Sequence, residues 1–129
     1  MDENIIKIDS VRFHWSKKSS FKIFVLNFEI NKGEKVLLLG ESGSGKTTLL
    51  SLICGFLNPL CGSISINGSM INKLSSKTRD EHRVDNIGII FQQFNLLPYA
   101  NVVDNIVLPL YFSEVRSASV TNHRESALN

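Results

Sequence analysis

One run of the sequence has the residue types and the spacing of a phosphate-binding site. It consists of Gly40, Glu41, Ser42, Gly43, Ser44, Gly45, Lys46 and Thr47, and it matches the pattern GxxxxGK(S/T) at every fixed position. A strand-to-helix turn of this kind aims backbone N–H groups and the positive end of a helix dipole at an anion. The run therefore predicts a P-loop, which binds the phosphates of a nucleotide.

The residues of this run have separate chemical roles in such a site. The glycines allow backbone dihedrals and a close approach to phosphate that a Cβ would hinder. Lys46 places an ammonium on the β- and γ-phosphates, the hydroxyl of Thr47 completes Mg²⁺ coordination, and Thr48 assists at the α-phosphate. The alternative is a glycine-rich turn with a solvated lysine. The position of the run between an apolar segment and an amphipathic one favours the P-loop.

The segments on either side of the P-loop have the patterns of strands and of a helix. Ile5–Trp15 and Phe21–Ile30 alternate between apolar and polar residues, which predicts two antiparallel strands. Lys35–Leu39 is a short apolar run that ends at a glycine, as is typical of a strand buried on both faces of a parallel sheet. Lys46–Leu57 carries apolar residues at helical spacing and predicts an amphipathic helix that faces a sheet.

The rest of the chain predicts shorter elements. Pro59 and Gly62 end the helix. The further elements are a strand with an Asn-Gly turn at Ser63–Gly68, a short helix around Arg79–Arg83, an apolar strand at Ile87–Phe91, and a short helix within Asn101–Phe112 that breaks at Pro109. From Ser113 onward the sequence is serine-rich and weakly patterned.

Composition places the chain among ordinary folded proteins. Its 129 residues suffice for one domain, and we expect that domain to be incomplete. A net charge of +2 with dispersed lysines and arginines gives no basic surface for nucleic acid. Cys54 and Cys61 lack metal-site spacing, which favours reduced cytosolic thiols. We expect no signal peptide, because the N-terminus lacks a basic region followed by an apolar core, and no membrane span, because no apolar run reaches about eighteen residues.

A second region resembles a known family. The run from Ile87 to Pro98, IGIIFQQFNLLP, resembles the Q-loop of ABC-transporter ATPases, in the form typical of lipoprotein-release and macrolide-export systems. Gly33-Glu34-Lys35 and the segment Pro59–Gly68 are also similar to that family, so the resemblance spans about Ile8 to Leu110. It implies an α/β fold of the ABC ATPase type, with residues 1–129 as a partial nucleotide-binding domain. That part holds an antiparallel β-subdomain, the strand and helix that flank the P-loop (the Walker A strand and helix), and the start of the helical subdomain.

The resemblance also implies roles for two residues outside the P-loop. Gln92 would be the Q-loop glutamine, which reaches Mg²⁺ and the attacking water, with the adjacent Gln93 as the alternative. Mg²⁺ would then have Thr47 and Gln92 as protein ligands. Trp15 would be the aromatic residue that stacks on the adenine of ATP, a position that is usually tyrosine in the family. The alternative for Trp15 is simple packing on a strand.

Partners and location follow from the same resemblance. Phe94, Leu96 and Leu97 would line the groove that receives a coupling helix of the transmembrane permease, and the alternative is that they form an ordinary core. A second nucleotide-binding subunit is implied for the full-length form. The implied location is cytoplasmic, peripheral at the inner face of the cell membrane.

Several motifs that the family uses for ATP hydrolysis are not found in these residues. There is no LSGGQ signature after the Q-loop, since Gly88 is the last glycine, and no Walker B strand that ends in Asp-Glu. D-loop and switch-histidine motifs are also missing. Two hypotheses result: an ATP-binding subunit that couples hydrolysis to transport, or a non-catalytic ATP-binding fragment of one. A small kinase or GTPase is disfavoured because no NKxD-type motif occurs. We also expect an unpaired edge at the Walker A strand.

Overall fold

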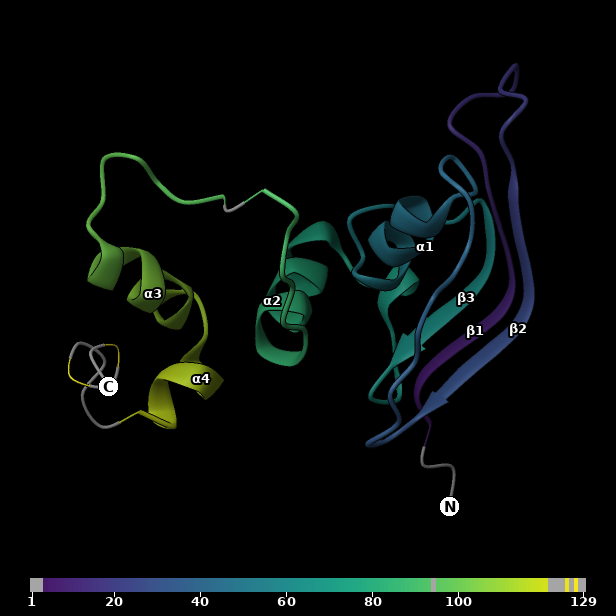
Figure 1. The fold of residues 1–129 in the computed structure, drawn as a ribbon. Coiled ribbons are helices and arrows are strands. Elements are labelled where there is room, and N and C mark those ends of the chain that lie inside the picture. The colour runs from purple at the N-terminus through teal and green to yellow at the C-terminus, as the bar shows by residue number, and fades with distance from the viewer. Residues whose placement is uncertain (1–3, 94, 121–124, 126, 128–129) are drawn as a thin grey trace. The chain divides into compact units, whose positions relative to one another are not determined.

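The chain forms two compact units. The computed structural model describes residues 4–93, 95–120, 125 and 127. The first unit is residues 1–79 and the second is residues 80–129 (Figure 1). The elements of the chain, in order, are β1 (Asn4–Phe13), β2 (Ile23–Asn31), α1 (Lys46–Ile53), β3 (Cys61–Ile66), β4 (Ser69–Met70), the short 3₁₀ turn η1 (Ile71–Lys73), α2 (Ser76–Asn86), α3 (Val102–Tyr111) and α4 (Glu114–Ala118).

An antiparallel sheet organises the first unit. Its strand order is β2-β1-β3-β4, and each neighbouring pair is antiparallel. The two predicted N-terminal strands are confirmed as β1 and β2. The predicted hairpin is also confirmed, because Asn67 and Gly68 join β3 to β4 with φ angles of 48° and 77°. Both angles are positive, as a two-residue hairpin turn of the I′ type requires.

An irregularity in β1 changes which residues face the core. Ile8 is fully buried, as alternation from Ile6 expects, but the next buried residues are Val11 and Phe13. The pairing of β1 with β3 shifts between Asp9 and Arg12, and Ser10 has a φ of 51°. A bulge of this kind moves the inward set from even to odd positions. Because of this bulge, Arg12 lies on the exposed side of β1, whereas Val11 and Phe13 face the core.

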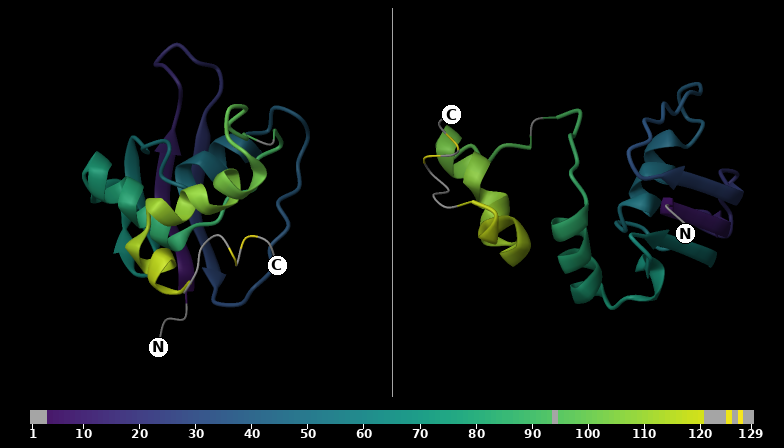
Figure 2. Two further views of the ribbon diagram at one scale, coloured as in Figure 1. Left: turned by 90° about the vertical axis from the view of Figure 1, so that its left-hand side faces the viewer. Right: turned by 90° about the horizontal axis from the view of Figure 1, so that it is seen from below.

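Helix α1 packs against one face of this sheet (Figures 1 and 2). Its residues Leu52 and Ile53 are buried together with Ile8, Val11 and Ile64 of the strands. The helix is shorter than the predicted Lys46–Leu57, because Gly55 has a φ of 72° and ends it. The N–H of Phe56 then bonds the carbonyl of Ser51 at 2.9 Å, which caps the last turn.

The prediction of a buried strand at Lys35–Leu39 is wrong for this structure. The segment belongs to no strand, and Figure 1 shows it as plain coil on the way from β2 to α1. Leu37 and Leu39 are both 79% exposed. A strand of a parallel sheet needs hydrogen-bonding neighbours and cover on both faces, and no described residue pairs with this segment.

The second unit is helical. Asn101 caps α3 by accepting from the N–H of Asp104 at 2.8 Å, which confirms a helix in this region. The expected break at Pro109 is wrong, since α3 continues to Tyr111; only the last turn follows the proline. The predicted strand Ile87–Phe91 does not form, and Ile90 is fully exposed. As with Lys35–Leu39, no described strand lies beside it to supply backbone partners.

Two helices exceed what the sequence predicted. Helix α2 covers eleven residues rather than the short helix around Arg79–Arg83, because Ser75 caps it through the N–H of Thr78. Helix α4 was not predicted. Its cap is Ser113, whose hydroxyl accepts from the N–H of Arg116 at 3.1 Å. None of the helices in the described part of the chain is long and apolar enough to cross a membrane.

One surface ion pair yields a pH-dependent prediction. Lys7 and Glu29 face each other across β1 and β2 at 3.0 Å, and the hydrogen bond from Lys7 is the main cause that lowers the pKa of Glu29 from 4.5. A lowered pKa stabilises the fold above the unfolded value, and this contribution is lost as the pH falls through the folded-state pKa. We expect Glu29→Gln to lower the urea midpoint slightly at pH 7 and low salt but not at acidic pH. An equal difference at both pH values would contradict this.

Candidate functional site

The P-loop joins the extended segment after β2 to the start of α1, and its glycines are required by the geometry. Gly43 and Gly45 have φ angles of 82° and 100°. A Cβ at Gly40 would lie 2.7 Å from the Ser44 hydroxyl, and one at Gly45 would lie 2.8 Å from Cζ of Phe21. Side chains at these positions would strain or displace the loop. Its conformation therefore depends on the residue type that the motif specifies.

The loop converges on the N-terminus of α1. This helix begins at Lys46, its N-cap is Gly45, and no side chain caps it. The first N–H groups of an uncapped helix have no partner within the helix and are available to an anion. The Lys46 ammonium donates to the carbonyls of Gly40 and Glu41 at 2.6 and 2.7 Å, so its charge is held at the mouth of the loop. This arrangement concentrates positive potential where a phosphate would bind.

The two threonines that follow the lysine lie in the first turn of α1. Thr47 is exposed and Thr48 is half-buried. Mg²⁺ prefers oxygen ligands and usually keeps several waters beside substrate phosphates, so an exposed hydroxyl at this position fits it. Among the described residues no group of three His, Cys, Asp or Glu side chains could hold a metal by itself. A metal here would depend on nucleotide oxygens and Thr47.

Trp15 lies in the loop between β1 and β2, and it is accessible. Its side chain is 61% exposed and contacts Phe13 edge-on, with ring centres 5.2 Å apart. Phe21 at the other end of the same loop reaches Gly45 of the P-loop. The structure therefore brings this hairpin loop and the P-loop together. Stacking of Trp15 on a base stays a prediction.

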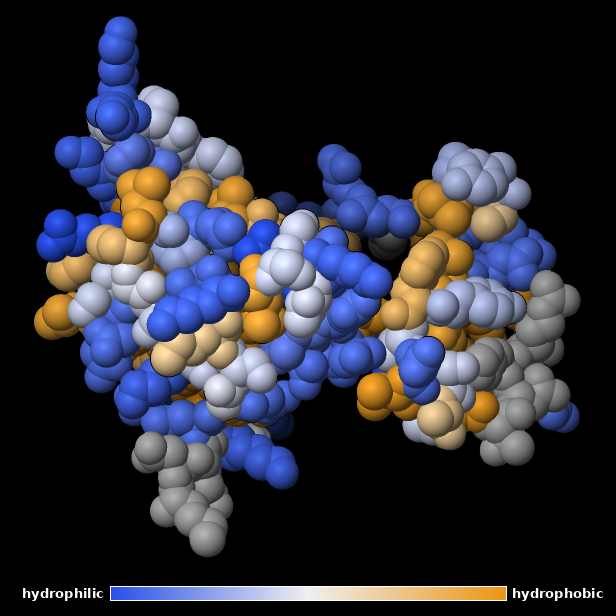
Figure 3. Space-filling view, turned by 180° about the vertical axis from the view of Figure 1, so that it is seen from behind, coloured by the Kyte–Doolittle hydropathy of each residue, from blue (hydrophilic) through white to orange (hydrophobic). Residues whose placement is uncertain are grey.

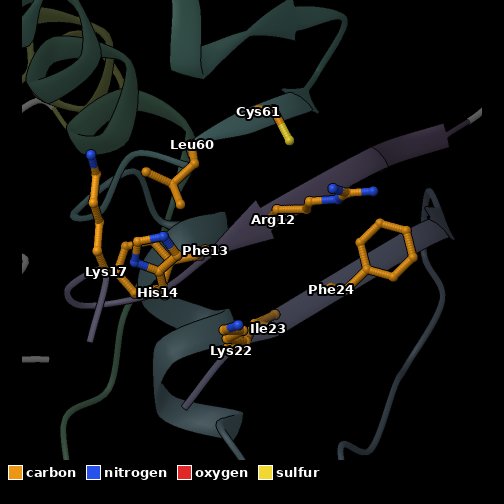
Figure 4. Close-up of a pocket in the computed structure, with 9 residues that line it drawn as sticks. All are labelled: Arg12, Phe13, His14, Lys17, Lys22, Ile23, Phe24, Leu60 and Cys61. Carbon is orange, nitrogen blue, oxygen red and sulfur yellow. The ribbon is translucent and has the colours of Figure 1, made fainter. Parts of the chain in front are cut away.

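A hollow of about 610 Å³ lies beside this loop. Figure 4 shows Arg12 next to Phe24, and the guanidinium carbon lies 5.1 Å from the ring centre. Lys17 and Lys22 also line it, so its lining is basic without an acidic member. Phe13 lines the hollow and contacts Trp15. The hollow therefore lies next to Trp15, and its basic lining attracts negative charge.

The predicted Q-loop lies in the second unit. Gln92 and Gln93 are both exposed, at a bend after the segment Ile87–Phe91. Their exposed amides are available to water and ligands. The P-loop belongs to the first unit, so the joint action of Gln92 with Lys46 and Thr47 on one Mg²⁺ stays a prediction.

The residues expected to meet the permease fall into three cases. Leu96 is 63% exposed, Leu97 is half-buried, and Phe94 lies outside the described residues. Exposed apolar side chains continue beyond them at Tyr99, Val102 and Ile106, which are 84%, 74% and 51% exposed. Figure 3 shows hydrophobic side chains gathered on the surface of this unit. Contact of these residues with a permease stays a prediction.

Three polar residues of the second unit, Ser113, Arg116 and Asn105, were missed by sequence reasoning. Ser113 is 2% exposed and donates to the Asp85 carboxylate, while Arg116 donates to the carbonyl of Ile87 at 2.8 Å. These bonds tie α4 to the residues that lead into the predicted Q-loop. Asn105 binds the loop before α3. Asn105 had a sequence signal, as a polar residue inside an apolar segment, whereas Ser113 and Arg116 lie in the weakly patterned serine-rich segment and had none.

A family model described as ABC transporter matches residues 23–129 of this chain. The chain belongs to the ABC transporter family. The predicted recognition and fold class are thereby confirmed, and the P-loop described above lies inside the matched region. The site residues named from the ABC pattern remain predictions, because the match identifies the family and not the role of each side chain.

Individual ABC relatives agree. The chain is 49% identical over 84 residues to an ABC transporter ATP-binding protein of Mycobacterium tuberculosis, a region that covers 65% of this chain and 34% of that protein. It is 37% identical over 92 residues to the lipoprotein-releasing system ATP-binding protein LolD of Bacteroides thetaiotaomicron, over 71% of this chain and 42% of LolD. The chain thus spans about a third to two fifths of these relatives.

Solved structures show the same fold. The ATP-binding cassette MJ0796, in a dimeric post-hydrolysis state bound to ADP and Pi, superposes with a TM-score of 0.77 at 32% identity. The superposition covers 95% of this chain and 54% of that cassette. The described units therefore correspond to part of an ABC cassette.

Proposed function

We propose that this chain is part of the ATP-binding subunit of an ABC transporter, and that its P-loop binds the phosphates of MgATP. The observation that carries the proposal is the P-loop itself. Its lysine is held at the mouth of a glycine-dependent loop in front of an uncapped helix N-terminus. Backbone N–H groups, a helix dipole and an ammonium together suit a polyphosphate.

Each proposed ligand residue has a stated part. The backbone of Gly40–Lys46 and the Lys46 ammonium hold the β- and γ-phosphates, Thr48 supports the α-phosphate, and Trp15 stacks on adenine. Mg²⁺ would be held by the Thr47 hydroxyl and by the Gln92 amide oxygen, and it neutralises charge on the phosphates. Gln92 also orients the attacking water in the complete enzyme. Support for these roles comes from the loop geometry and from the family.

The proposed partners are a transmembrane permease and a second nucleotide-binding subunit. The permease would contact the exposed apolar residues of the Q-loop region, including Leu96. A second subunit is suggested by MJ0796, which is dimeric in the structures that resemble this chain. ATP binding and hydrolysis would then drive substrate transport, with the chain placed at the cytoplasmic face of the membrane.

Titration of MgATP into the purified chain, followed by calorimetry, tests the proposal directly. We expect one saturable site per chain. Absence of saturable binding by a chain that retains its circular dichroism spectrum would overturn the proposal.

The same preparation separates the two function hypotheses. No LSGGQ signature or Walker B sequence occurs in residues 1–129. If the chain is a non-catalytic fragment, it should therefore bind ATP without hydrolysing it. Steady phosphate release by this chain alone, at a rate that depends on Lys46, would exclude the hypothesis of a non-catalytic fragment. The family role of the complete subunit would be unaffected.

Trp15 offers a built-in reporter of nucleotide binding. It is the only tryptophan of the chain, and it is 61% exposed. If adenine stacks on it, MgATP should quench its fluorescence, and Trp15→Ala should weaken binding about 10-fold, an aromatic contact of roughly 1.4 kcal/mol. Trp15→Tyr should keep most of the affinity. Equal affinities of the Ala and Tyr variants would assign Trp15 to packing only.

A further inference from the structure

A row of three side chains crosses the outer face of the sheet in the first unit. Arg12 of β1 lies opposite Phe24 of β2 and opposite Cys61 of β3 in the strand register. Residues directly opposite each other in an antiparallel pair point to the same face. Val11 and Phe13, the neighbours of Arg12 in β1, are buried, whereas Arg12 is exposed. The row therefore lies on the face away from α1, and Figure 4 shows it on three neighbouring strands.

Arg12 is a cation whose position is restrained in advance. Its guanidinium carbon lies 5.1 Å from the centre of the Phe24 ring, a cation–π contact. No carboxylate of the described residues pairs with it. A guanidinium presents a planar fork of N–H donors that matches a carboxylate in two parallel hydrogen bonds. Because the ring restrains the group while its fork is unused by protein carboxylates, Arg12 is suited to bind an anion.

The hollow beside this row combines further cations with an apolar lining. Lys17 and Lys22 line it together with Arg12, and none of the described residues that line it is acidic. The apolar part of the lining comes from Phe13, Ile23, Phe24 and Leu60. Its volume of about 610 Å³ lies within the range of small-molecule sites, roughly 300–1,000 Å³, which are mostly apolar with a few polar groups. The hollow therefore fits an apolar body that carries a negative charge.

His14 adds an unpaired polar atom to the same hollow. It is one of the lining residues, and its Nδ1 is buried with no hydrogen-bond partner among the described residues. Buried polar atoms of folded proteins are nearly always hydrogen-bonded. An unpaired atom of this kind favours a ligand that brings a hydrogen-bonding group of its own.

We propose that this hollow, which we call the Arg12 hollow, binds a small aromatic carboxylate. The carboxylate is held by the fork of Arg12 and by the Lys22 ammonium, and the aromatic body packs on the apolar lining that includes Leu60. The inference does not rest on the proposed function. Trp15 is not a lining residue of the hollow, and the Arg12 row lies on the sheet face opposite to α1. The Arg12 hollow and the P-loop are therefore separate sites that can be occupied together.

The first test compares three probes on the full chain. Cinnamate, an aromatic carboxylate, is titrated and followed by amide NMR shifts; we expect saturation with a Kd on the order of 1 mM and the largest shifts at Arg12, Phe24 and Cys61. Cinnamamide has the same ring without the charge and should bind at least about 10-fold more weakly. Acetate lacks the ring and should not saturate below about 10 mM. Equal affinities of cinnamate and either other probe would overturn the proposal.

The second test separates Arg12 from general electrostatics. Arg12→Gln and Lys18→Gln each remove one positive charge from an exposed position, but Lys18 does not line the hollow. Arg12→Gln should weaken cinnamate binding about 10-fold, and Lys18→Gln less than about 2-fold. Arg12→Lys keeps the charge without the fork and should recover only part of the loss. Equal losses in the two glutamine variants would overturn the proposal.

A second lining cation keeps the proposal testable if Arg12→Gln disturbs the sheet. Lys22→Gln changes an exposed side chain and should weaken cinnamate binding about 3-fold, with an unchanged circular dichroism spectrum. Affinity equal to that of the unaltered chain would remove Lys22 from the site and overturn the proposed pair of cations.

The last test asks whether the anion occupies the P-loop instead. We expect the affinity for cinnamate to change less than about 2-fold in the presence of saturating MgATP and in Lys46→Ala, because the two sites are separate. Displacement by MgATP, or loss of binding in Lys46→Ala, would overturn the proposal. If the chain binds cinnamate in an Arg12-dependent way but does not bind MgATP, the proposed function fails and the Arg12 hollow stands.

Discussion

Replacing Lys46 with alanine is expected to weaken MgATP binding about 100-fold, which corresponds to roughly 3 kcal/mol. The Lys46 ammonium is held by the carbonyls of Gly40 and Glu41 at the mouth of the P-loop. Its removal leaves the backbone N–H groups and the helix dipole but no full positive charge against the γ-phosphate. Calorimetric titration of MgATP and MgADP measures the effect, which should be larger for ATP because ATP carries the additional phosphate.

Lys35→Ala is the matched control for this prediction. Lys35 is exposed and lies before the loop. It changes the net charge by the same amount as Lys46→Ala, so a general electrostatic effect would appear in both variants. Equal ATP affinities of the two variants would mean that the phosphates bind elsewhere.

The candidate site was predictable because its chemistry is local. The pattern from Gly40 to Thr47 prescribes dihedrals, a helix start and a charged side chain within eight residues, and the structure shows positive φ angles at Gly43 and Gly45. The roles of Trp15 and Gln92 could be assigned only by family resemblance. Their action on one nucleotide depends on tertiary arrangement, which no local pattern specifies.

Strand predictions succeeded where both partners lie in the described residues. Segments β1 and β2 pair with each other, and β1 contributes the buried residues Ile8, Val11 and Phe13. Lys35–Leu39 and Ile87–Phe91 have the composition of buried strands, yet neither forms one. An apolar run predicts that a segment can be buried, whereas the strand exists only with neighbours for its backbone groups. The bulge in β1 was also invisible in the sequence, because it depends on a contact with β3.

The close contact between β3 and the bulge in β1 makes Gly62 sensitive to substitution. We expect Gly62→Ala to lower the free energy of unfolding by about 3 kcal/mol. Gly62 has a φ of 85°, and a Cβ there would lie 2.4 Å from the Ser10 carbonyl oxygen and 2.5 Å from that of Asp9. These are main-chain atoms at the bulge, so no side-chain rotation relieves the overlap. Urea unfolding followed by circular dichroism measures the change.

Gly68→Ala separates the two causes of this destabilisation. Gly68 has a similar φ of 77°, but a Cβ there meets nothing within 4 Å, so only the conformational cost of about 1 kcal/mol applies. The difference between the two variants therefore measures the close approach of β3 to β1. Equal losses would show that the bulge relaxes at little cost. A larger loss at Gly62 would show that this glycine holds the register that turns Val11 and Phe13 inward, and with them the strand that leads to Trp15.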